Sequence, residues 1–270
     1  MEKDNKNKDQ NLDIKEELEW EAFLEKDEEW EQNKKRQKKR KKLIVKTVSS
    51  FLVLAMLVSG LQIWFNLFNL PAIEFLKVSQ RLSKDPEVQA FKKAIVTIEW
   101  DGVKGTGFTI DPNGIIVTND HVVEHTDTVK VHYQTGDSYI GEVVSRNSEL
   151  DLAVVKIEAT VLPVLPLSYE KDWETLIGEE IIFIGNPLSF TQIANEGTIA
   201  GKVLLKDWKV PVMMIDAPVY RGNSGSPVLN QNGKVIGVLF ATISSPEGNN
   251  RVGVATPAYY IKDLLADIRE

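Results

Sequence analysis

The stretch AIVTIEWDGVKGTGFTIDPNGIIVTND (94–120) holds three short runs rich in Val, Ile and Thr, separated by Asp, Gly, Pro and Asn. β-Branched residues in runs of this length favour strands, and the residues between them favour turns. The sequence therefore predicts three β-strands, over 94–100, 105–110 and 114–120.

The same pattern continues almost to the end of the chain. Further runs of this kind lie at 128–133, 139–145 and 152–158, and, after a join near 161–170, at 180–185, 195–205, 212–217, 226–230, 234–241 and 251–257. Many short strands at regular spacing are typical of a sandwich or barrel, and we expect an all-β double barrel over 91–270. Residues 258–268 have the apolar spacing of a terminal helix.

The N-terminal part has a different composition. Residues 1–33 carry 13 acidic and 5 basic residues, and residues 34–42 (KKRQKKRKK) carry 8 basic residues and no acidic one. Residues 47–73 are uncharged, and as a helix they would span roughly 40 Å, which exceeds a bilayer core of about 30 Å. We therefore predict a charged tail over 1–42, a transmembrane helix over 43–70 and a polar juxtamembrane linker over 71–90.

The basic cluster on the N-terminal side of this span indicates its orientation. By the positive-inside rule the N-terminus is cytoplasmic and residues 91–270 lie outside the cytoplasm. A cleaved signal peptide has a short leading segment and a small-residue cleavage site, whereas 42 residues precede this span. Membrane topology and contact with anionic lipid explain the basic run, so we expect no nucleic-acid partner.

The composition also limits the chemistry. The chain has no cysteine, which excludes disulfide scaffolds, Cys-ligated zinc and thiol catalysis. It has only three histidines, His121, His125 and His132, so any histidine-dependent mechanism must use one of them.

Three segments carry residues suited to catalysis: VTNDHVVEH (117–125) with His121, SELDLAVVKI (148–157) with Asp151, and YRGNSGSP (220–227) with Ser224. Taken singly, each also fits a capping histidine, a turn aspartate or a glycine-rich loop. Taken together, they supply the base, orienting acid and nucleophile that acyl transfer from a peptide requires. Gly222 and Gly225 let the backbone bend so that amides face one point.

Chain order separates the possible serine hydrolases. The order here is His, Asp, Ser on a predicted double barrel, as in chymotrypsin. The α/β-hydrolase order is excluded because no histidine follows Ser224. Subtilisin order would need an acid before His121 in an α/β pattern that the sequence does not show.

Residues 91–270 resemble a trypsin-like serine protease domain of the HtrA (Deg, high-temperature-requirement) type. The resemblance rests on GTGFTIDPNGIIVTNDHVV (105–123), ELDLAVVKI (149–157), IGNP (184–187), IDAPVYRGNSGSPV (215–228) and VGVATP (252–257). It implies that His121 is the general base, Asp151 its orienting acid and Ser224 the nucleophile. The amides of Gly222 and Ser224, with Asn223 between them, would form the oxyanion hole.

The resemblance also implies a function. It is that of a membrane-anchored serine endopeptidase of bacterial type that acts on unfolded or extended proteins outside the cytoplasm, in protein quality control. Members of the family often form trimers, and we expect no cofactor and no metal. We expect the substrate to contact Val219, Leu239, Phe240 and Ala241. The apolar segment 217–219, without an acid at the pocket base, predicts cleavage after small or medium apolar side chains.

The sequence departs from the family in three places. Ser226 stands where the family usually has a second glycine. No PDZ domain follows the terminal helix, so we expect a protease without one. The cytoplasmic tail lies outside the protease pattern.

Two alternatives remain open. His121, Glu124 and His125 form H-x-x-E-H, the inverted zinc-peptidase motif, which would need a helix and a further ligand. The chain would otherwise be an inactive protease-fold binding protein or holdase, if its loops do not order the oxyanion hole.

Overall fold

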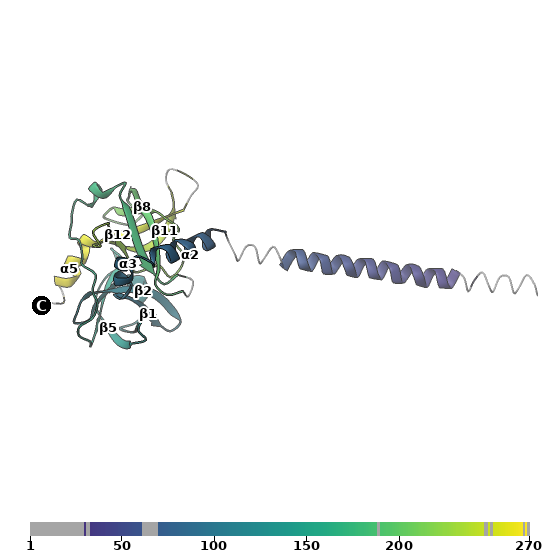
Figure 1. Ribbon diagram of the computed structural model, residues 1–270, viewed down its shortest axis with the longest axis horizontal. Coiled ribbons are helices and arrows are strands. Elements are labelled where there is room, and N and C mark those ends of the chain that lie inside the picture. The colour runs from purple at the N-terminus through teal and green to yellow at the C-terminus, as the bar shows by residue number, and fades with distance from the viewer. Residues whose placement is uncertain are drawn as a thin grey trace, which may run out of the picture. The chain divides into compact units, whose positions relative to one another are not determined.

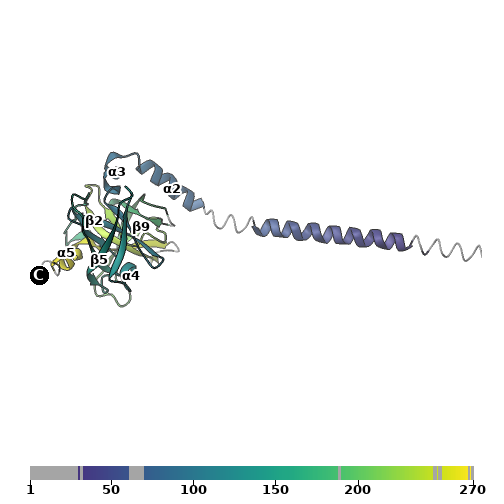
Figure 2. The ribbon, with the colours of Figure 1, turned by 90° about the horizontal axis from the view of Figure 1, so that it is seen from below.

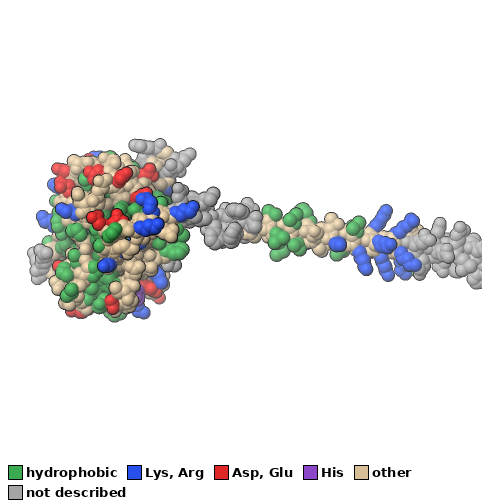
Figure 3. All heavy atoms as spheres, in the orientation of Figure 1, with side chains coloured by type: hydrophobic (Ala, Val, Ile, Leu, Met, Phe, Trp, Pro, Cys, Tyr) green, Lys and Arg blue, Asp and Glu red, His purple; other side chains and the backbone are tan. Residues whose placement is uncertain are grey.

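The computed structural model describes residue 30 and residues 33–60, 70–187, 190–245, 248, 251–266 and 268. The chain divides into two compact units, residues 1–69 and residues 70–270. The first unit contains the helix Asn33–Gly60, which is long and apolar enough to cross a membrane, with a mean hydropathy of 2.0 in its most apolar window. Lys and Arg side chains gather at its N-terminal end and apolar side chains follow (Figure 3). The last residues of the predicted span, 61–69, and most of the acidic tail lie outside the described residues.

The second unit contains two closed six-stranded barrels (Figure 1). In the first barrel the strand order is β1, β2, β3, β6, β5 and β4, and every neighbouring pair is antiparallel. Its strands are β1 (Ile95–Trp100), β2 (Val103–Asp111), β3 (Ile115–Thr118), β4 (Thr128–Tyr133), β5 (Ser138–Asn147) and β6 (Leu152–Ile157).

The second barrel has the order β10, β11, β12, β9, β8 and β7, also antiparallel. Its strands are β7 (Glu180–Gly185), β8 (Ile193–Val203), β9 (Val212–Asp216), β10 (Ser226–Leu229), β11 (Val235–Ser244) and β12 (Arg251–Pro257). All twelve predicted strands are present, so the all-β double-barrel prediction is confirmed. The connection between the barrels includes the short helix η1 (Trp173–Leu176).

The core has three main parts. One apolar cluster fills each barrel, around Ile98 and Ile116 in the first and around Phe183 and Ile215 in the second. A third cluster joins the barrels to each other and includes Phe108, Leu152, Ile184, Leu229 and Val238. Because side chains alternate along a strand, one barrel can fill its own interior and still present apolar groups to its neighbour.

Three helices complete this shared core. They are α2 (Leu70–Leu82), α3 (Pro86–Lys92) and α5 (Ile261–Ala266), which follows the short helix η3 (Ala258–Tyr260). Leu82, Val88, Ile261 and Leu264 of these helices are buried in the third cluster. Figures 1 and 2 show the helices on the outside of the barrels. Residues 71–90, expected as a polar linker, thus contain two helices that pack against the protease unit.

Candidate active site

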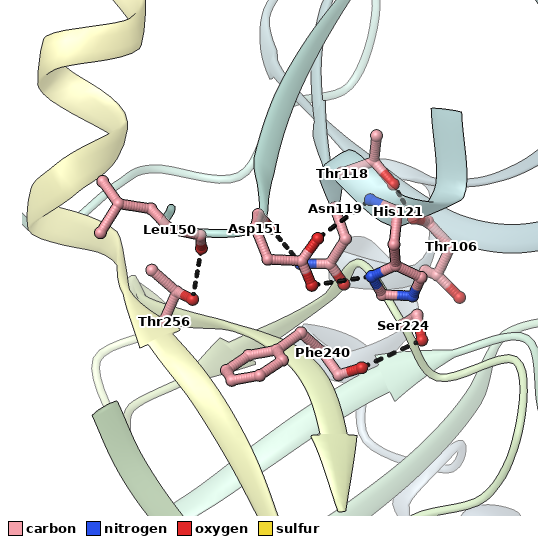
Figure 4. A network of polar contacts seen from close by, with 9 residues as sticks. All are labelled: Thr106, Thr118, Asn119, His121, Leu150, Asp151, Ser224, Phe240 and Thr256. Carbon is pink, nitrogen blue, oxygen red and sulfur yellow. Dashed lines mark hydrogen bonds and ion pairs between the residues drawn. The ribbon is translucent and has the colours of Figure 1, made fainter. Parts of the chain in front are cut away.

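His121 lies on the short helix α4 (Asp120–Val123), directly after β3. The side-chain amide of Asn119, the residue between them, donates to the Asp151 carbonyl oxygen at 2.7 Å. This bond joins the start of α4 to the turn before β6. As a result His121 and Asp151, 30 positions apart in the sequence, face each other (Figure 4).

Two hydrogen bonds join His121 to Asp151. Imidazole Nδ1 lies 2.7 Å from Oδ2, and the backbone N–H of His121 donates to Oδ1 at 2.9 Å. A carboxylate at Nδ1 favours the tautomer with its proton there, which leaves Nε2 free to accept a proton. The backbone of Asp151 is left-handed, with φ of 49°, a conformation that Asp tolerates better than most residues. The pair therefore has the geometry of a general base held by its orienting acid.

The electrostatic surroundings favour the charged form of the imidazole. The hydrogen bond that Nδ1 donates to Asp151 raises the pKa of His121 above its usual value, and it outweighs the lowering effect of burial. The negative charges of Asp151, Asp120 and Glu124 act in the same direction. An acid that stabilises the imidazolium in this way also stabilises the transition state in which the imidazole takes up a proton.

This shift sets the expected pH dependence. Only the neutral imidazole accepts a proton, and its raised pKa moves the loss of the neutral form to a higher pH. We therefore expect kcat/KM to fall with decreasing pH through a midpoint above the ordinary histidine value of about 6.5. Initial rates on a peptide between about pH 5 and pH 9 measure the midpoint. A profile that stays flat down to about pH 4 would contradict the role of His121.

Ser224 lies in the tight loop between β9 and β10. The Asn223 N–H donates to the Tyr220 carbonyl at 3.1 Å, and we call the loop 220–224 the oxyanion turn. The Gly225 N–H donates to the Leu239 carbonyl at 2.8 Å, and the Ser224 carbonyl accepts from the Thr106 N–H at 2.8 Å. The backbone around Ser224 is therefore held by both barrels.

The two glycines that flank this site are required by its geometry. Gly222 has φ of +99° and Gly225 has φ of +85°. A Cβ on Gly222 would lie 2.4 Å from the Asn186 carbonyl oxygen, and one on Gly225 would lie 1.9 Å from the Thr106 carbonyl oxygen. Both contacts are far inside van der Waals distance, so no other L-residue fits without a shift of the backbone.

This turn leaves two amides for a ligand. Among the described residues, the backbone N–H groups of Gly222 and Ser224 have no hydrogen-bond acceptor. The intervening backbone N–H of Asn223 already donates to the Tyr220 carbonyl oxygen, so it is not a third donor for the ligand. The arrangement matches an oxyanion hole made by Gly222 and Ser224, with Asn223 between them.

The Ser224 hydroxyl donates to the Phe240 carbonyl oxygen at 3.2 Å. Figure 4 shows it beside the edge of the His121 ring that faces away from Asp151, and both side chains line one cleft. Rotation about the serine Cα–Cβ bond would redirect the hydroxyl to Nε2. Catalytic hydrogen bonds often tighten only when substrate is bound.

One edge of β11 is open next to Ser224. β10 pairs with β11 only as far as Leu239, whereas β12 pairs with it out to Ser244. From Phe240 onward, this edge of β11 has no partner strand among the described residues. An open strand edge of this kind accepts an extended peptide by backbone hydrogen bonding.

Of the predicted substrate-binding residues, Leu239, Phe240 and Ala241 belong to β11, and Val219 lies in the loop after β9. Val219 and Leu239 converge on Gly253, where an added Cβ would lie 2.8 Å from Val219 Cγ2 and 3.2 Å from Leu239 Cδ1. Val219 is partly exposed and forms an apolar wall, whereas Leu239 is fully buried behind it. Phe240 and Ala241 belong to the open edge, where they offer backbone groups.

A cleft of about 650 Å³ opens beside the nucleophile. Its lining residues come from the β1–β2 hairpin, α4, the segment after β7 and the oxyanion turn: Thr97, Gly102, Val103, Lys104, His121, Val122, Asn186, Phe190, Thr191, Arg221, Gly222 and Ser224. None of them belongs to β11. The open strand edge therefore does not line this cleft.

The inverted zinc motif is not assembled. Helix α4 ends at Val123, so Glu124 and His125 lie beyond the helix on which the motif would place its ligands. His125 lies against the Trp100 ring, with ring centroids 6.4 Å apart, and is exposed. Across the part of the chain that the structure describes, no three His, Asp or Glu side chains are grouped as metal ligands would be.

Threonine side chains that the sequence reasoning did not single out connect the barrels at the site. Thr106 Oγ1 donates to the Gly222 carbonyl at 2.8 Å and accepts the Asn186 N–H at 3.0 Å. Thr256 of β12 donates to the Leu150 carbonyl at 2.9 Å, next to Asp151. Thr106 stands between two glycines in the stretch 105–107, but nothing in that pattern reveals a partner in the other barrel.

The chain is similar in sequence to known serine proteases. The sequence profile of the trypsin-like peptidase domain matches residues 105–238, a stretch that includes His121, Asp151 and Ser224. The DegP-like periplasmic serine endoprotease of Chlamydia trachomatis is 36% identical over 169 residues, which are 61% of this chain and 33% of that protein. The human serine protease HTRA4 is 35% identical over 173 residues, 62% of this chain and 35% of that protein.

This chain therefore spans about a third of the length of these curated relatives. Among solved structures, the serine endoprotease from Yersinia pestis superposes with a TM-score of 0.58 and 28% sequence identity. The match covers 68% of this chain and 66% of that one.

Proposed function

We propose that this chain, which is similar to trypsin-like peptidase domains and to HtrA-type serine endoproteases, is a membrane-anchored protease that cleaves extended or unfolded protein segments outside the cytoplasm. One observation carries the proposal. The hydrogen-bonded pair His121 and Asp151 lies beside Ser224, at a turn with two amides available for an oxyanion. Base, orienting acid, nucleophile and oxyanion donors are the groups that acyl transfer from a peptide needs.

In the first half of the reaction, Ser224 attacks the substrate carbonyl carbon. The hydroxyl turns from the Phe240 carbonyl to Nε2 of His121 and gives up its proton as the new C–O bond forms. The carbonyl oxygen becomes an oxyanion that accepts hydrogen bonds from the N–H groups of Gly222 and Ser224. Asp151 remains ionised and stabilises the imidazolium.

Collapse of this intermediate breaks the peptide bond. The imidazolium returns its proton to the departing nitrogen, and the new amine leaves while Ser224 keeps the acyl group. We assign the departing segment to the cleft of about 650 Å³, because His121 and Ser224 line it and the open edge of β11 does not. Water, activated by His121, then hydrolyses the acyl-enzyme.

The acyl half of the substrate is proposed to pair with β11. The open edge from Phe240 onward would take a strand by backbone hydrogen bonds, which do not depend on side-chain identity. A folded substrate has few free strands to offer, so this mode of binding selects extended or unfolded chains. That selectivity suits a role in protein quality control.

Specificity at the cleaved position is proposed to follow from Val219 and Leu239. Their methyl groups converge on Gly253, and the partly exposed Val219 presents a small apolar surface with Leu239 buried behind it. We expect matched peptides with Val or Ala before the scissile bond to be cleaved with a kcat/KM about 100-fold above peptides with Lys or Arg there, because an unpaired charge is costly to bury. Parallel assays on peptides that differ at this position test the prediction. A basic preference would overturn the assignment of the pocket.

Anchoring is proposed through the helix Asn33–Gly60. Its large apolar side chains, from Leu43 to Val58, are more than half exposed, which water would oppose and lipid would favour. Because the chain has no cysteine, single-cysteine variants can report its orientation. In intact cells, an impermeant maleimide is expected to label Lys130→Cys on the protease unit and to spare Gln37→Cys in the basic run.

The catalytic proposal is tested by active-site labelling of the full chain in detergent micelles. A fluorophosphonate is expected to form an adduct on Ser224, mapped by mass spectrometry, at a rate that a zinc chelator does not change. A folded protein that gives no adduct would instead support an inactive, binding role. Peptidase activity that a chelator removes would support metal-dependent catalysis.

A further inference from the structure

Helix α2, which precedes the first barrel, packs along β8 of the second barrel. The Ser79 hydroxyl accepts the N–H of Ala194 at 3.1 Å, and Arg81 forms an ion pair with Glu196. Ser79 is buried, and the Arg81 pair is exposed. The helix is therefore fixed on the barrel surface by contacts on both backbone and side chains.

The same helix reaches the oxyanion turn. Phe75 is only 3% exposed, and its ring meets the ring of Tyr220 edge to face, with centroids 4.7 Å apart and planes at 73°. Aromatic pairs at this distance and angle have a preferred geometry beyond simple contact. Tyr220 is the first residue of the oxyanion turn.

The contact bears on the residue that shapes this turn. The Tyr220 carbonyl accepts the Asn223 N–H at 3.1 Å, and this bond closes the loop that presents the Gly222 amide. A shift of Tyr220 would therefore move the closing acceptor and rotate the peptide groups between the two residues. Burial raises the pKa of the Tyr220 phenol, in keeping with a ring held against protein.

The other supports of the turn act at its far end. Thr106 donates hydrogen bonds to the carbonyl oxygens of Gly222 and Ser224, and the Gly225 N–H donates to the Leu239 carbonyl oxygen. The Tyr220 hydroxyl has no hydrogen-bond partner among the described residues. Within the same residues, the Tyr220 ring contacts the ring of Phe75. At the near end, Val219 packs with Leu239 on Gly253, and the Tyr220 ring is held by Phe75 of α2.

We propose that Phe75 is a positioning residue for catalysis: by packing on Tyr220, helix α2 holds the oxyanion turn in the shape that directs the Gly222 and Ser224 amides at the substrate. The inference rests on the proposed peptidase function and adds a residue outside the two barrels to its machinery. Phe75 touches neither substrate nor triad and acts through Tyr220 alone.

Truncating the ring should affect turnover rather than binding. Phe75→Ala is expected to lower kcat about 10- to 100-fold, since a small displacement of an oxyanion donor has effects of this size. KM should stay within about twofold, because the β11 edge and the apolar wall are untouched. Fluorophosphonate labelling of Ser224 should slow in parallel. The acid limb of the pH profile should not move, since His121 and Asp151 keep their contacts.

The assay uses the full chain in detergent micelles, with folding followed by thermal melting. Leu76→Ala, at the exposed neighbouring position of the same helix, is the matched control and should keep wild-type kcat. Phe75→Leu retains an apolar side chain without the ring edge and should give an intermediate kcat. If Phe75→Ala does not fold, this variant carries the test.

A double-mutant cycle with Tyr220→Leu separates positioning from general stability. If Phe75 acts through Tyr220, the double variant should be no slower than the slower single variant. Additive losses, an unchanged kcat in folded Phe75→Ala, or an effect on KM alone would each overturn the inference. A wild-type chain that forms no adduct on Ser224 would be a failure of the proposed function instead.

Discussion

Asp151→Asn is expected to lower kcat about 10⁴-fold, the size of effect seen when the orienting acid of a serine protease loses its charge. The amide can still meet Nδ1 of His121, but its NH₂ group favours the tautomer with the proton on Nε2, and the imidazolium loses its counter-charge. The pKa of His121 should fall as well, because its hydrogen bond to the Asp151 carboxylate is the main cause of the raised pKa. The measurement is single-turnover cleavage of a peptide, which isolates the acylation step.

A matched control comes from Asp207, which is exposed and also has a left-handed backbone, with φ of 66° against 49° for Asp151. Asn tolerates this conformation as well as Asp does, so Asp207→Asn should leave kcat unchanged. A loss smaller than about tenfold in Asp151→Asn would mean that Asp151 is not the orienting acid.

Gly222→Ala is expected to lower kcat by about 10²- to 10³-fold, as removal of one oxyanion donor does. The new Cβ would lie 2.4 Å from the Asn186 carbonyl oxygen, in a backbone with φ of +99°. Relief of that clash requires the peptide of Gly222 to move, and its amide then misses the oxyanion. Binding of the acyl segment along β11 does not involve this group, so KM should change little.

Gly136→Ala separates the clash from the backbone strain. Gly136 has a nearly identical φ of +96°, and nothing lies within 4 Å of an added Cβ. Both variants should lose about 1–2 kcal/mol of stability from the left-handed backbone. Only Gly222→Ala should lose activity, and equal kcat values in the two variants would remove Gly222 from the oxyanion hole.

The strands could be predicted from sequence because their signal is local. In runs such as 94–100 and 152–158, apolar residues alternate with polar ones where one face of the strand is buried, and follow one another where both faces are buried. Turn residues mark the ends of these runs. The structure has β1 at Ile95–Trp100 and β6 at Leu152–Ile157, within a residue of the prediction.

Helices α2 and α3 are harder to predict because each contains a proline, Pro71 or Pro86, and proline disfavours a helix interior. In the structure Pro86 is the first residue of α3, a position where proline fits a helix, and the Asp85 carboxylate caps it by accepting the Glu87 N–H at 2.8 Å. The Asp-Pro pair was thus a helix start. That α2 packs on β8 depends on tertiary contacts that no local pattern encodes.

The site was predictable in its residues but not in its connections. Residue type and chain order pointed to His121, Asp151 and Ser224, because acyl transfer requires these residue types and this order accompanies the double-barrel fold. The hydrogen bond from Thr106 to Gly222 and the contact between Phe75 and Tyr220 join residues more than 110 positions apart. Spacing in the sequence carries no information about such pairs. The hydroxyl of Ser224 on the Phe240 carbonyl is likewise a property of the folded loop.

The proposed catalytic groups are divided between the two barrels, and this division predicts how activity is lost on heating. His121 and Asp151 belong to the first barrel, Ser224 belongs to the second, and one apolar cluster with helices at both ends of the domain holds the halves together. A small hinge movement of one half against the other would separate base from nucleophile while each barrel kept its strands. Heating should therefore abolish peptidase activity at a lower temperature than the one at which the strands unfold. Loss of activity is then the most sensitive measure of how cooperatively the domain unfolds.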